Sequence, residues 1–181
     1  MRRISVSFGF CALICILAWL DWRFCLSFLL CALVHELGHL AAMKLCGISV
    51  DRITLSAGGA VIRAGFHDYK QELWCAAAGP LSGAVFALAL LRIYPKIAIV
   101  SLLLSLINLL PLYPLDGGRI LRALLCLWVE ETRASHMLRA VTVGCCCMLM
   151  LLACWGTVCL QMGLWPIFTA LALLWRAGDR E

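Results

Sequence analysis

The chain has 181 residues, of which 64% are hydrophobic and 14% charged, and a mean hydropathy of +0.99, which together exclude a soluble globular domain. The apolar segments leave no stretch long enough for a separate soluble domain, so residues 1–181 are predicted to form one polytopic membrane domain. The net charge of +5 fits attraction to anionic lipid, and a nucleic-acid partner is not needed to explain it.

Apolar runs predict an all-α membrane protein with about six transmembrane helices. The first run has a basic tip but no small-residue cleavage site after it, so we interpret it as a retained span and not as a removed signal. The predicted spans cover residues 4–20, 24–46, 73–91 and 97–110, and two more lie between residues 138 and 175, with a turn near Gly156–Gly163.

Basic residues predict the orientation of these spans. One side of the six-span layout collects most of the Lys and Arg residues, while the other side has only Arg23, Arg92 and Lys96. Because loops rich in Lys and Arg tend to stay cytoplasmic, both termini are expected in the cytoplasm. The expected location is a cell membrane, which the chain crosses several times, with the lipid bilayer as its surroundings.

The second predicted span contains LVHELGHLAA at residues 33–42, in which His35, Glu36 and His39 form an HExxH pattern. Residues four apart on a helix project from nearly the same face, so the two imidazoles can bind one metal ion, and the pattern predicts a zinc site. Glu36, next to the first ligand, can take a proton from a water molecule that the ion has made more acidic. The pattern therefore predicts a general base beside a zinc site.

The setting of this pattern makes it more specific than its three fixed positions alone. Titratable groups inside a spanning helix cost about 2.5 to 3.5 kcal/mol each on insertion scales, so they usually persist only with a partner and a function. The alternative is that these residues are satisfied hydrogen-bonding groups between helices.

Residues 48–65, ISVDRITLSAGGAVIRAG, predict a small membrane-associated β-hairpin between the second and third spans. The segment has β-branched residues, partial alternation at Ile53 and Leu55, and a Gly58–Gly59 pair suited to a turn. Backbone cannot stay unpaired in lipid, so the hairpin is expected at the interface or enclosed by helices. An irregular interfacial loop is the alternative.

A catalytic zinc site has three protein ligands and an open position for water, so a third ligand is needed. Asp116 is the candidate, because it follows the fourth predicted span in INLLPLYPLDGG, where prolines interrupt the helix and Gly117 and Gly118 free the backbone. Its alternative role is the N-cap of a helix starting near Gly118, and the two roles can coexist. Asn108, earlier in this segment, is either a substrate-binding amide or a cap for carbonyl groups at the helix end.

These motifs closely resemble the site-2 protease family of intramembrane zinc metalloproteases. HELGH on one span with NLLPLYPLDGG on a later one carries the resemblance, and AAAGPLSG at residues 76–83 looks like the Gly-Pro span of that family. The resemblance covers about residues 24–125. Within the family, the sequence is most similar to the bacterial stage IV sporulation protease branch. Relatives in that branch commonly carry a CBS domain after the last span, whereas this sequence ends at Glu181, so ATP regulation and a sporulation role are not carried over.

The resemblance implies a zinc metalloprotease domain in which His35, His39 and Asp116 bind zinc, Glu36 is the general base and Asn108 lies in a substrate-facing segment. It implies that the hairpin presents a strand edge to which an unwound substrate helix pairs as an added strand.

The implied reaction is hydrolysis of peptide bonds in or near transmembrane segments of single-span or membrane-tethered proteins, in a bacterial plasma membrane. The sequence leaves open whether a membrane-bound regulator gates the site. One rival is a catalytically silent zinc-binding membrane scaffold or a transporter, neither of which needs Glu36. Another is a prenyl-protein endopeptidase, which would share the histidines and the glutamate but not the LDG element.

Overall fold

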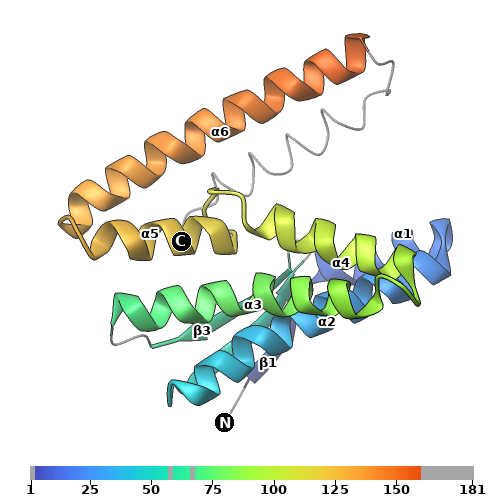
Figure 1. Cartoon of the computed structure of the whole chain (residues 1–181), viewed down its shortest axis with the longest axis horizontal. Helices are drawn as coiled ribbons and strands as arrows, with labels where there is room; N and C mark the ends of the chain where they lie inside the picture. The colour runs from blue at the N-terminus through green and yellow to red at the C-terminus, as the bar shows by residue number, and fades with distance from the viewer. Residues whose placement is uncertain (1–2, 57–58, 66–67, 160–181) are drawn as a thin grey trace. The chain divides into compact units, whose positions relative to one another are not determined.

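The computed structural model describes residues 3–56, 59–65 and 68–159 (Figure 1). By its internal contacts the chain divides into two compact units, residues 1–109 and 110–181. The first unit contains β1 (Arg3–Val6), α1 (Phe8–Leu20), α2 (Trp22–Leu45), β2 (Val50–Ser56), β3 (Gly59–Ala64), α3 (Tyr69–Leu90) and α4 (Pro95–Asn108). The second contains α5 (Asp116–Cys126) and α6 (Glu131–Cys159).

Three helices among the described residues, α2, α3 and α6, are long and apolar enough to cross a membrane. Helices α1 and α4 are apolar but have only 13 and 14 residues. At about 1.5 Å per residue each is about 20 Å long, which is less than the hydrocarbon core of about 30 Å. The protein is thus a mostly helical membrane protein, as predicted. Five of the six predicted spans correspond to three long and two short apolar helices, and the sixth falls outside the described residues.

The first predicted span begins too early. Residues Arg3–Val6 (RISV) form a strand, in which two β-branched residues alternate with polar ones, a pattern that favours β structure. The helix starts only at Phe8, after Ser7, whose hydroxyl accepts a hydrogen bond from the backbone N–H of Phe10 at 3.3 Å. The prediction from hydropathy placed the strand and the helix in one span, because Ile4 and Val6 are as apolar as the residues of a spanning segment.

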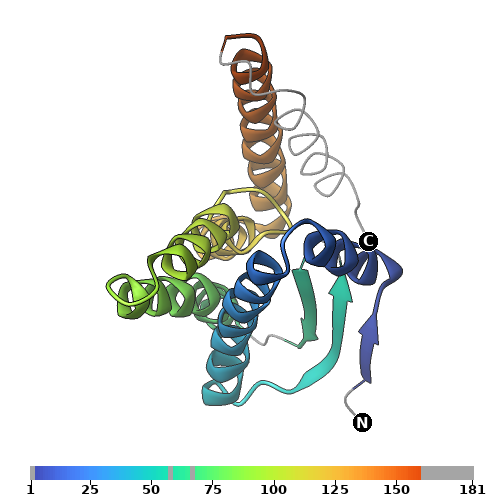
Figure 2. The ribbon, with the colours of Figure 1, turned by 90° about the vertical axis from the view of Figure 1, so that its right-hand side faces the viewer.

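The three strands form one sheet in the order β1-β2-β3, with β1 along an outer edge (Figure 2). Strands β2 and β3 pair antiparallel, from Val50 opposite Ala64 to Ser56 opposite Gly59, at the place predicted for the hairpin. The membrane association of this pair stays a prediction, and residues 57–58, in its predicted turn, lie outside the described residues. Strand β1 pairs parallel with β2, which was not predicted from the sequence. A hydrogen bond of 3.0 Å joins the hydroxyl groups of Ser5 and Thr54.

Helix α2 is bounded by two local signals. At its start the Asp21 carboxylate accepts hydrogen bonds from the backbone N–H groups of Arg23 and Phe24, at 2.9 and 3.2 Å. At its end Gly47 has φ of 70°, a left-handed conformation that favours glycine.

Two backbone bonds close this helix end. The N–H of Gly47 donates to Lys44 O and that of Ile48 to Met43 O, at 3.2 and 2.9 Å, which is the pattern of a Schellman motif. Ile48 and Met43 are also buried together with Cys75 of α3. The turn after α2 therefore fixes where the chain leaves the helix and packs the base of β2 against α3.

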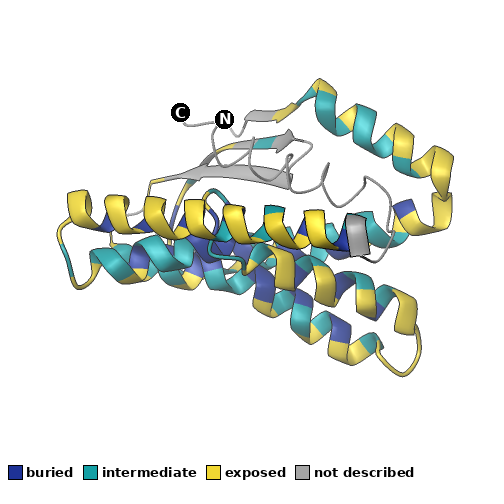
Figure 3. Cartoon of the chain, turned by 90° about the horizontal axis from the view of Figure 1, so that it is seen from above, coloured by how far each residue is buried: buried dark blue, intermediate teal, exposed yellow. Residues whose placement is uncertain are grey.

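Helices α2, α3 and α4 pack side by side, with α3 in contact with both others (Figure 1). Figure 3 shows that their buried residues lie where the helices meet, while their outer faces are exposed. Between α2 and α3 a Cβ on Gly38 would lie 2.6 Å from Ala78 O, so this glycine allows the close approach of the two helices. The Ser82 hydroxyl donates across the same interface to Val34 O at 3.1 Å.

The interface between α3 and α4 follows the same principle. A Cβ on Gly83 would overlap the Ser105 hydroxyl, and the Ser101 hydroxyl donates to Gly83 O at 2.8 Å. Small and hydroxylated residues replace large apolar ones at helix contacts in lipid, where the hydrophobic effect does not drive helices together. The result is a closely packed set of three helices, α2, α3 and α4.

In the second unit α5 and α6 contact each other, and Arg122 of α5 forms an ion pair of 2.9 Å with Glu131. Helix α6 begins at Glu131, not at the predicted residue 138, and remains helical through Gly156, where the prediction placed a turn. The prediction counted only apolar residues, whereas the first two turns of α6 carry charged and polar ones. A Cβ on Gly118 would lie 2.5 Å from Tyr113 N, so this glycine lets the segment before α5 fold back onto it.

Candidate metal centre

The two histidines of HELGH lie on the buried side of α2. Cys31, His35, His39 and Met43 are spaced by four residues and all are buried. The exposed fractions of His35 and His39 are 4% and 5%, although the helix is apolar enough to cross a membrane. The prediction that both imidazoles share one helix face is confirmed by this stripe.

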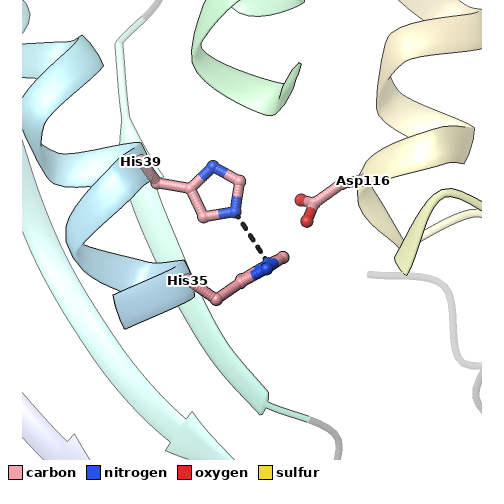
Figure 4. Close-up of side chains that lie close together, drawn as sticks. All are labelled: His35, His39 and Asp116. Carbon is pink, nitrogen blue, oxygen red and sulfur yellow. Dashed lines mark hydrogen bonds between the residues drawn. The ribbon is translucent and has the colours of Figure 1, made fainter. Parts of the chain in front are cut away.

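The two rings meet through their Nε2 atoms, which are 3.3 Å apart (Figure 4). Their centroids are 4.9 Å apart and the planes are nearly perpendicular, at 81°. A zinc ion bound by two imidazole nitrogens at about 2.0–2.1 Å, with a tetrahedral angle between them, holds those nitrogens about 3.3 Å apart. The side chains of α2 alone therefore present two ligand atoms at the spacing that a zinc ion requires.

His39 makes a further contact through its other nitrogen. Its Nδ1 lies 2.7 Å from the backbone carbonyl oxygen of Cys75 on α3. Cys75 itself is fully buried, with no exposed surface. Sequence patterns did not indicate this partner, because every residue has a carbonyl group and its direction depends on how α2 and α3 pack.

Glu36 follows His35 on α2 and is half-buried, in contrast to the two buried histidines. One residue along a helix turns the side chain by about 100°, so Glu36 projects beside the metal-binding face and not from it. This is where a proton acceptor that is not a ligand has to lie.

Asp116 is buried, with 7% of its surface exposed, and is the first residue of α5. The N-cap position belongs to Leu115, so Asp116 does not act as the N-cap of a helix starting near Gly118. Its carboxylate lies 3.9 Å from the Arg119 guanidinium, one turn further along α5. A carboxylate in the first helical turn is also favoured by the positive end of the helix dipole.

Asn108 is the last residue of α4 and is half-buried. Its side-chain amide donates to the carbonyl oxygen of Leu104 in the same helix at 2.9 Å. The amide therefore satisfies a helix carbonyl, which is the structural alternative considered for it, and this contact leaves its carbonyl oxygen for other partners.

His35, His39 and Asp116 are all buried, and the side chain of each offers one atom that can bind a metal ion. Two imidazoles and one carboxylate form a donor set that zinc takes in catalytic sites, where a fourth position stays open to water. The residues present thus fit the zinc predicted from the sequence.

Comparison with known families gives one match over most of the chain. The sequence matches the profile described as Peptidase family M50 over residues 23–96 and 89–152. These residues include the HELGH motif of α2 and the LDGG motif at the start of α5.

Individual proteins are also similar to this chain. The stage IV sporulation protein FB of Bacillus subtilis is 31% identical over 163 residues, which cover 82% of this chain and 56% of that protein. A protein named as a zinc metalloprotease from Methanocaldococcus jannaschii is 35% identical over 105 residues, 51% of this chain and 31% of that protein. The chain thus spans about half of the first relative and about a third of the second.

Among solved structures, the fold is similar to that of the site-2 protease from Methanocaldococcus jannaschii. The TM-score is 0.75, the sequence identity is 22%, and the match covers 98% of this chain and 89% of that one. At this identity the likeness concerns the fold.

Proposed function

The chain belongs to Peptidase family M50, and from this premise we propose that it is an intramembrane zinc metalloprotease. Its substrates are membrane proteins, cleaved by water at peptide bonds in or near their transmembrane segments. The family resemblance predicted from the sequence is confirmed by the matched profile and by the sporulation protein among the relatives. The reaction and its substrates are our proposal for this chain.

One observation carries the proposal. Two buried imidazoles with Nε2 atoms 3.3 Å apart, and a glutamate next to the first, lie on a helix that is apolar enough to cross a membrane. Placing such groups in an apolar helix costs several kcal/mol in total, by an order-of-magnitude sum of insertion costs of about 2.5 to 3.5 kcal/mol for a charged residue. A metal site with a proton acceptor beside it accounts for all three residues at once.

The roles of the residues follow from their positions. We assign His35, His39 and Asp116 as ligands, and zinc, when bound, supplies the acidity that makes a water molecule nucleophilic near neutral pH. Glu36 takes a proton from the attacking water and passes it to the leaving amine, as general base and then general acid. The chain itself forms no covalent bond with the substrate in this scheme.

Asn108 is assigned to the substrate-facing segment. Its half-buried position at the end of α4 supports this role, since the amide carbonyl oxygen can accept a bond from a substrate backbone N–H while its nitrogen holds Leu104 O. In this role the hydrogen bond to Leu104 O holds the amide of Asn108 in the orientation that substrate binding requires.

The sheet offers a place for an unwound substrate segment. Strand β2 has neighbours on both sides, so a substrate strand can add to the predicted hairpin only along β3, the outer strand of that pair. A photo-crosslinking residue at position 65, just after β3, should trap a bound substrate more than one at position 5 in β1. Equal trapping at the two positions would argue against addition at β3.

The proposed location is a bacterial plasma membrane, with both termini cytoplasmic. In this orientation the C-terminal end of α2 is cytoplasmic, and His35 lies ten residues, or about 15 Å, before Leu45. The metal then sits within the bilayer towards its cytoplasmic half, and cleavage products leave on that face. Membrane-tethered substrates and a membrane-bound regulator remain the proposed partners.

The test is cleavage of a tagged single-span substrate, with zinc content measured on the same preparations. Glu36→Gln should retain zinc and reduce cleavage by about 10²- to 10⁴-fold, the usual contribution of a general base. His35→Ala should lose both, while the matched control Glu130→Gln, at an exposed position before α6, should keep both. Undiminished cleavage by Glu36→Gln would remove the assignment. The same variant should also trap natural substrates for identification by mass spectrometry.

The rival of a silent zinc scaffold or a transporter makes different predictions. A scaffold binds zinc but shows no cleavage in any variant. A transporter carries zinc into proteoliposomes at a rate that Glu36→Gln does not change. The half-buried position of Glu36 beside the metal-binding face favours the protease, because neither rival uses a proton acceptor there.

A further inference from the structure

Helix α3 contacts the candidate ligand His39 at two points. The first contact is the bond between His39 Nδ1 and Cys75 O, at 2.7 Å. A carbonyl oxygen only accepts hydrogen bonds, so Nδ1 has to carry the proton. In a neutral imidazole the Nε2 atom is then unprotonated, and its lone pair can accept a hydrogen bond or bind a metal ion.

The second contact is Gly79, which lies one helical turn after Cys75. A Cβ built on this residue would overlap His39 Nε2 and Cε1 and would lie 2.8 Å from Cδ2. The edge of the ring that holds the ligand atom thus rests directly on the backbone of α3. Any other residue at position 79 would have to displace the imidazole, because a helix backbone cannot yield as a flexible side chain does.

The two contacts together fix both the tautomer and the position of the ring. His39 is 5% exposed, so water does not compete strongly for Nδ1. The fixed Nε2 lies 3.3 Å from His35 Nε2, the separation that suits a shared zinc ion. The arrangement uses only residues of the first unit.

We propose that Cys75 and Gly79 of α3 are positioning residues that preset His39 as an Nδ1-protonated ligand aimed at His35. The Cys75 carbonyl selects the tautomer, and the missing side chain of Gly79 makes room for the ring. Partners that orient a histidine ligand in this way typically change metal affinity by about 10- to 100-fold. The inference rests on the proposed zinc site but not on the proposed proteolysis.

The first test reads the tautomer in the metal-free wild-type protein. Histidine labelled with ¹⁵N distinguishes protonated from unprotonated ring nitrogens by NMR, and a His39→Gln variant assigns the His39 resonances among the four histidines. In the neutral ring we expect the proton on Nδ1 and not on Nε2. A protonated Nε2 with an unprotonated Nδ1 would overturn the proposal.

The second test measures zinc affinity in Gly79→Ala. We expect it to fall by about 10- to 100-fold, with a shift of the His39 Nδ1 resonance as its bond to Cys75 is distorted. The matched control is Gly83→Ala combined with Ser105→Ala, which adds the same methyl group one turn along α3 and removes the hydroxyl that it would meet. This control should bind zinc as the wild type does.

The outcomes separate the two proposals. Unchanged affinity in a folded Gly79→Ala variant would overturn the positioning role, and if that variant does not fold, the wild-type tautomer decides. A wild type that binds zinc with the expected tautomer but cleaves no substrate would refute the protease and leave the positioning role intact.

Discussion

His35 and His39 are four residues apart on a helix, and that spacing alone brings their imidazoles to one face. The two histidines and the glutamate were therefore predictable from the sequence, as was the presence of a buried carboxylate at Asp116. The hydrogen bond from His39 to Cys75 O was not predictable, because it depends on the depth at which α3 packs against α2. The sequence also did not indicate that Asp116 is the first residue of α5, because an Asp before two glycines is more typical of an N-cap than of a first helical turn.

A prediction at this scale concerns the third ligand. Asp116→Asn keeps the volume of the side chain but removes its charge. Loss of a residue that only hydrogen-bonds to a ligand lowers metal affinity by about 10- to 100-fold, and loss of this ligand should lower zinc affinity by more. Asp68→Asn is the matched control, because Asp68 caps α3 from an exposed position and asparagine caps equally well. Titration with a competing chelator measures the effect. Equal zinc affinity in Asp116→Asn and the wild type would exclude Asp116 from the site.

A second prediction separates the two roles of Asn108. If the amide holds substrate, Asn108→Ala should raise KM or lower kcat for a membrane substrate while zinc content stays near that of the wild type. If its only role is the bond to Leu104 O, Tm should fall with little change in kcat/KM beyond that due to lost protein. Kinetics and thermal unfolding in the same detergent distinguish these results.

At the scale of elements, the apolar runs predicted the helices well and their ends poorly. Helix α6 extends beyond its predicted start, because hydropathy does not register a polar first turn as helix. Strand β1 was joined to α1 for the opposite reason, since a short apolar strand looks the same as the first turn of a span. The pairing of β2 with β3 coincided with the segment rich in β-branched residues, whereas the parallel partner of β2 comes from far away in the sequence.

The end of α2 gives a prediction at this scale. Gly47→Ala should destabilise the protein by about 1–2 kcal/mol, since an L-residue at φ of 70° strains the backbone. Gly144→Ala is the control, because a Cβ there meets nothing within 4 Å and alanine favours a helix over glycine by about 0.5–1 kcal/mol. Reversible unfolding in detergent measures both. A Gly47→Ala variant as stable as the wild type would show that the turn relaxes without cost.

At the scale of the whole molecule, composition predicted a membrane protein, and residues 3–159, apart from the gaps at 57–58 and 66–67, contain three helices long and apolar enough to cross a bilayer. The predicted count of six is not confirmed, because two of the apolar runs form helices of only 13 and 14 residues, which are too short to span by themselves. Topology rests on the distribution of Lys and Arg, which acts during insertion and leaves no trace in internal contacts.

The last prediction concerns the proposed orientation, in which both termini are cytoplasmic. A reporter active only outside the cytoplasm, inserted in the loop at residues 91–94 between α3 and α4, should be active. The same reporter inserted at residues 127–130, between α5 and α6, should be inactive, and a reporter active only in the cytoplasm should give the opposite pattern. The two loops differ in basic surroundings but are similar in length, so each is the control for the other. Activity in the second loop alone would invert the proposed topology.

The parallel pairing of β1 with β2 affects how the protein is made. Ser5 and Thr54, joined by a hydrogen bond, are 49 positions apart, and both helices α1 and α2 lie between them. A ribosome produces β1 before both helices and β2 after them, so β1 has no partner strand until α1 and α2 have been made. The sheet can therefore be completed only after both helices have been synthesised, and a nascent chain arrested before residue 50 would hold both histidines but no sheet beside them.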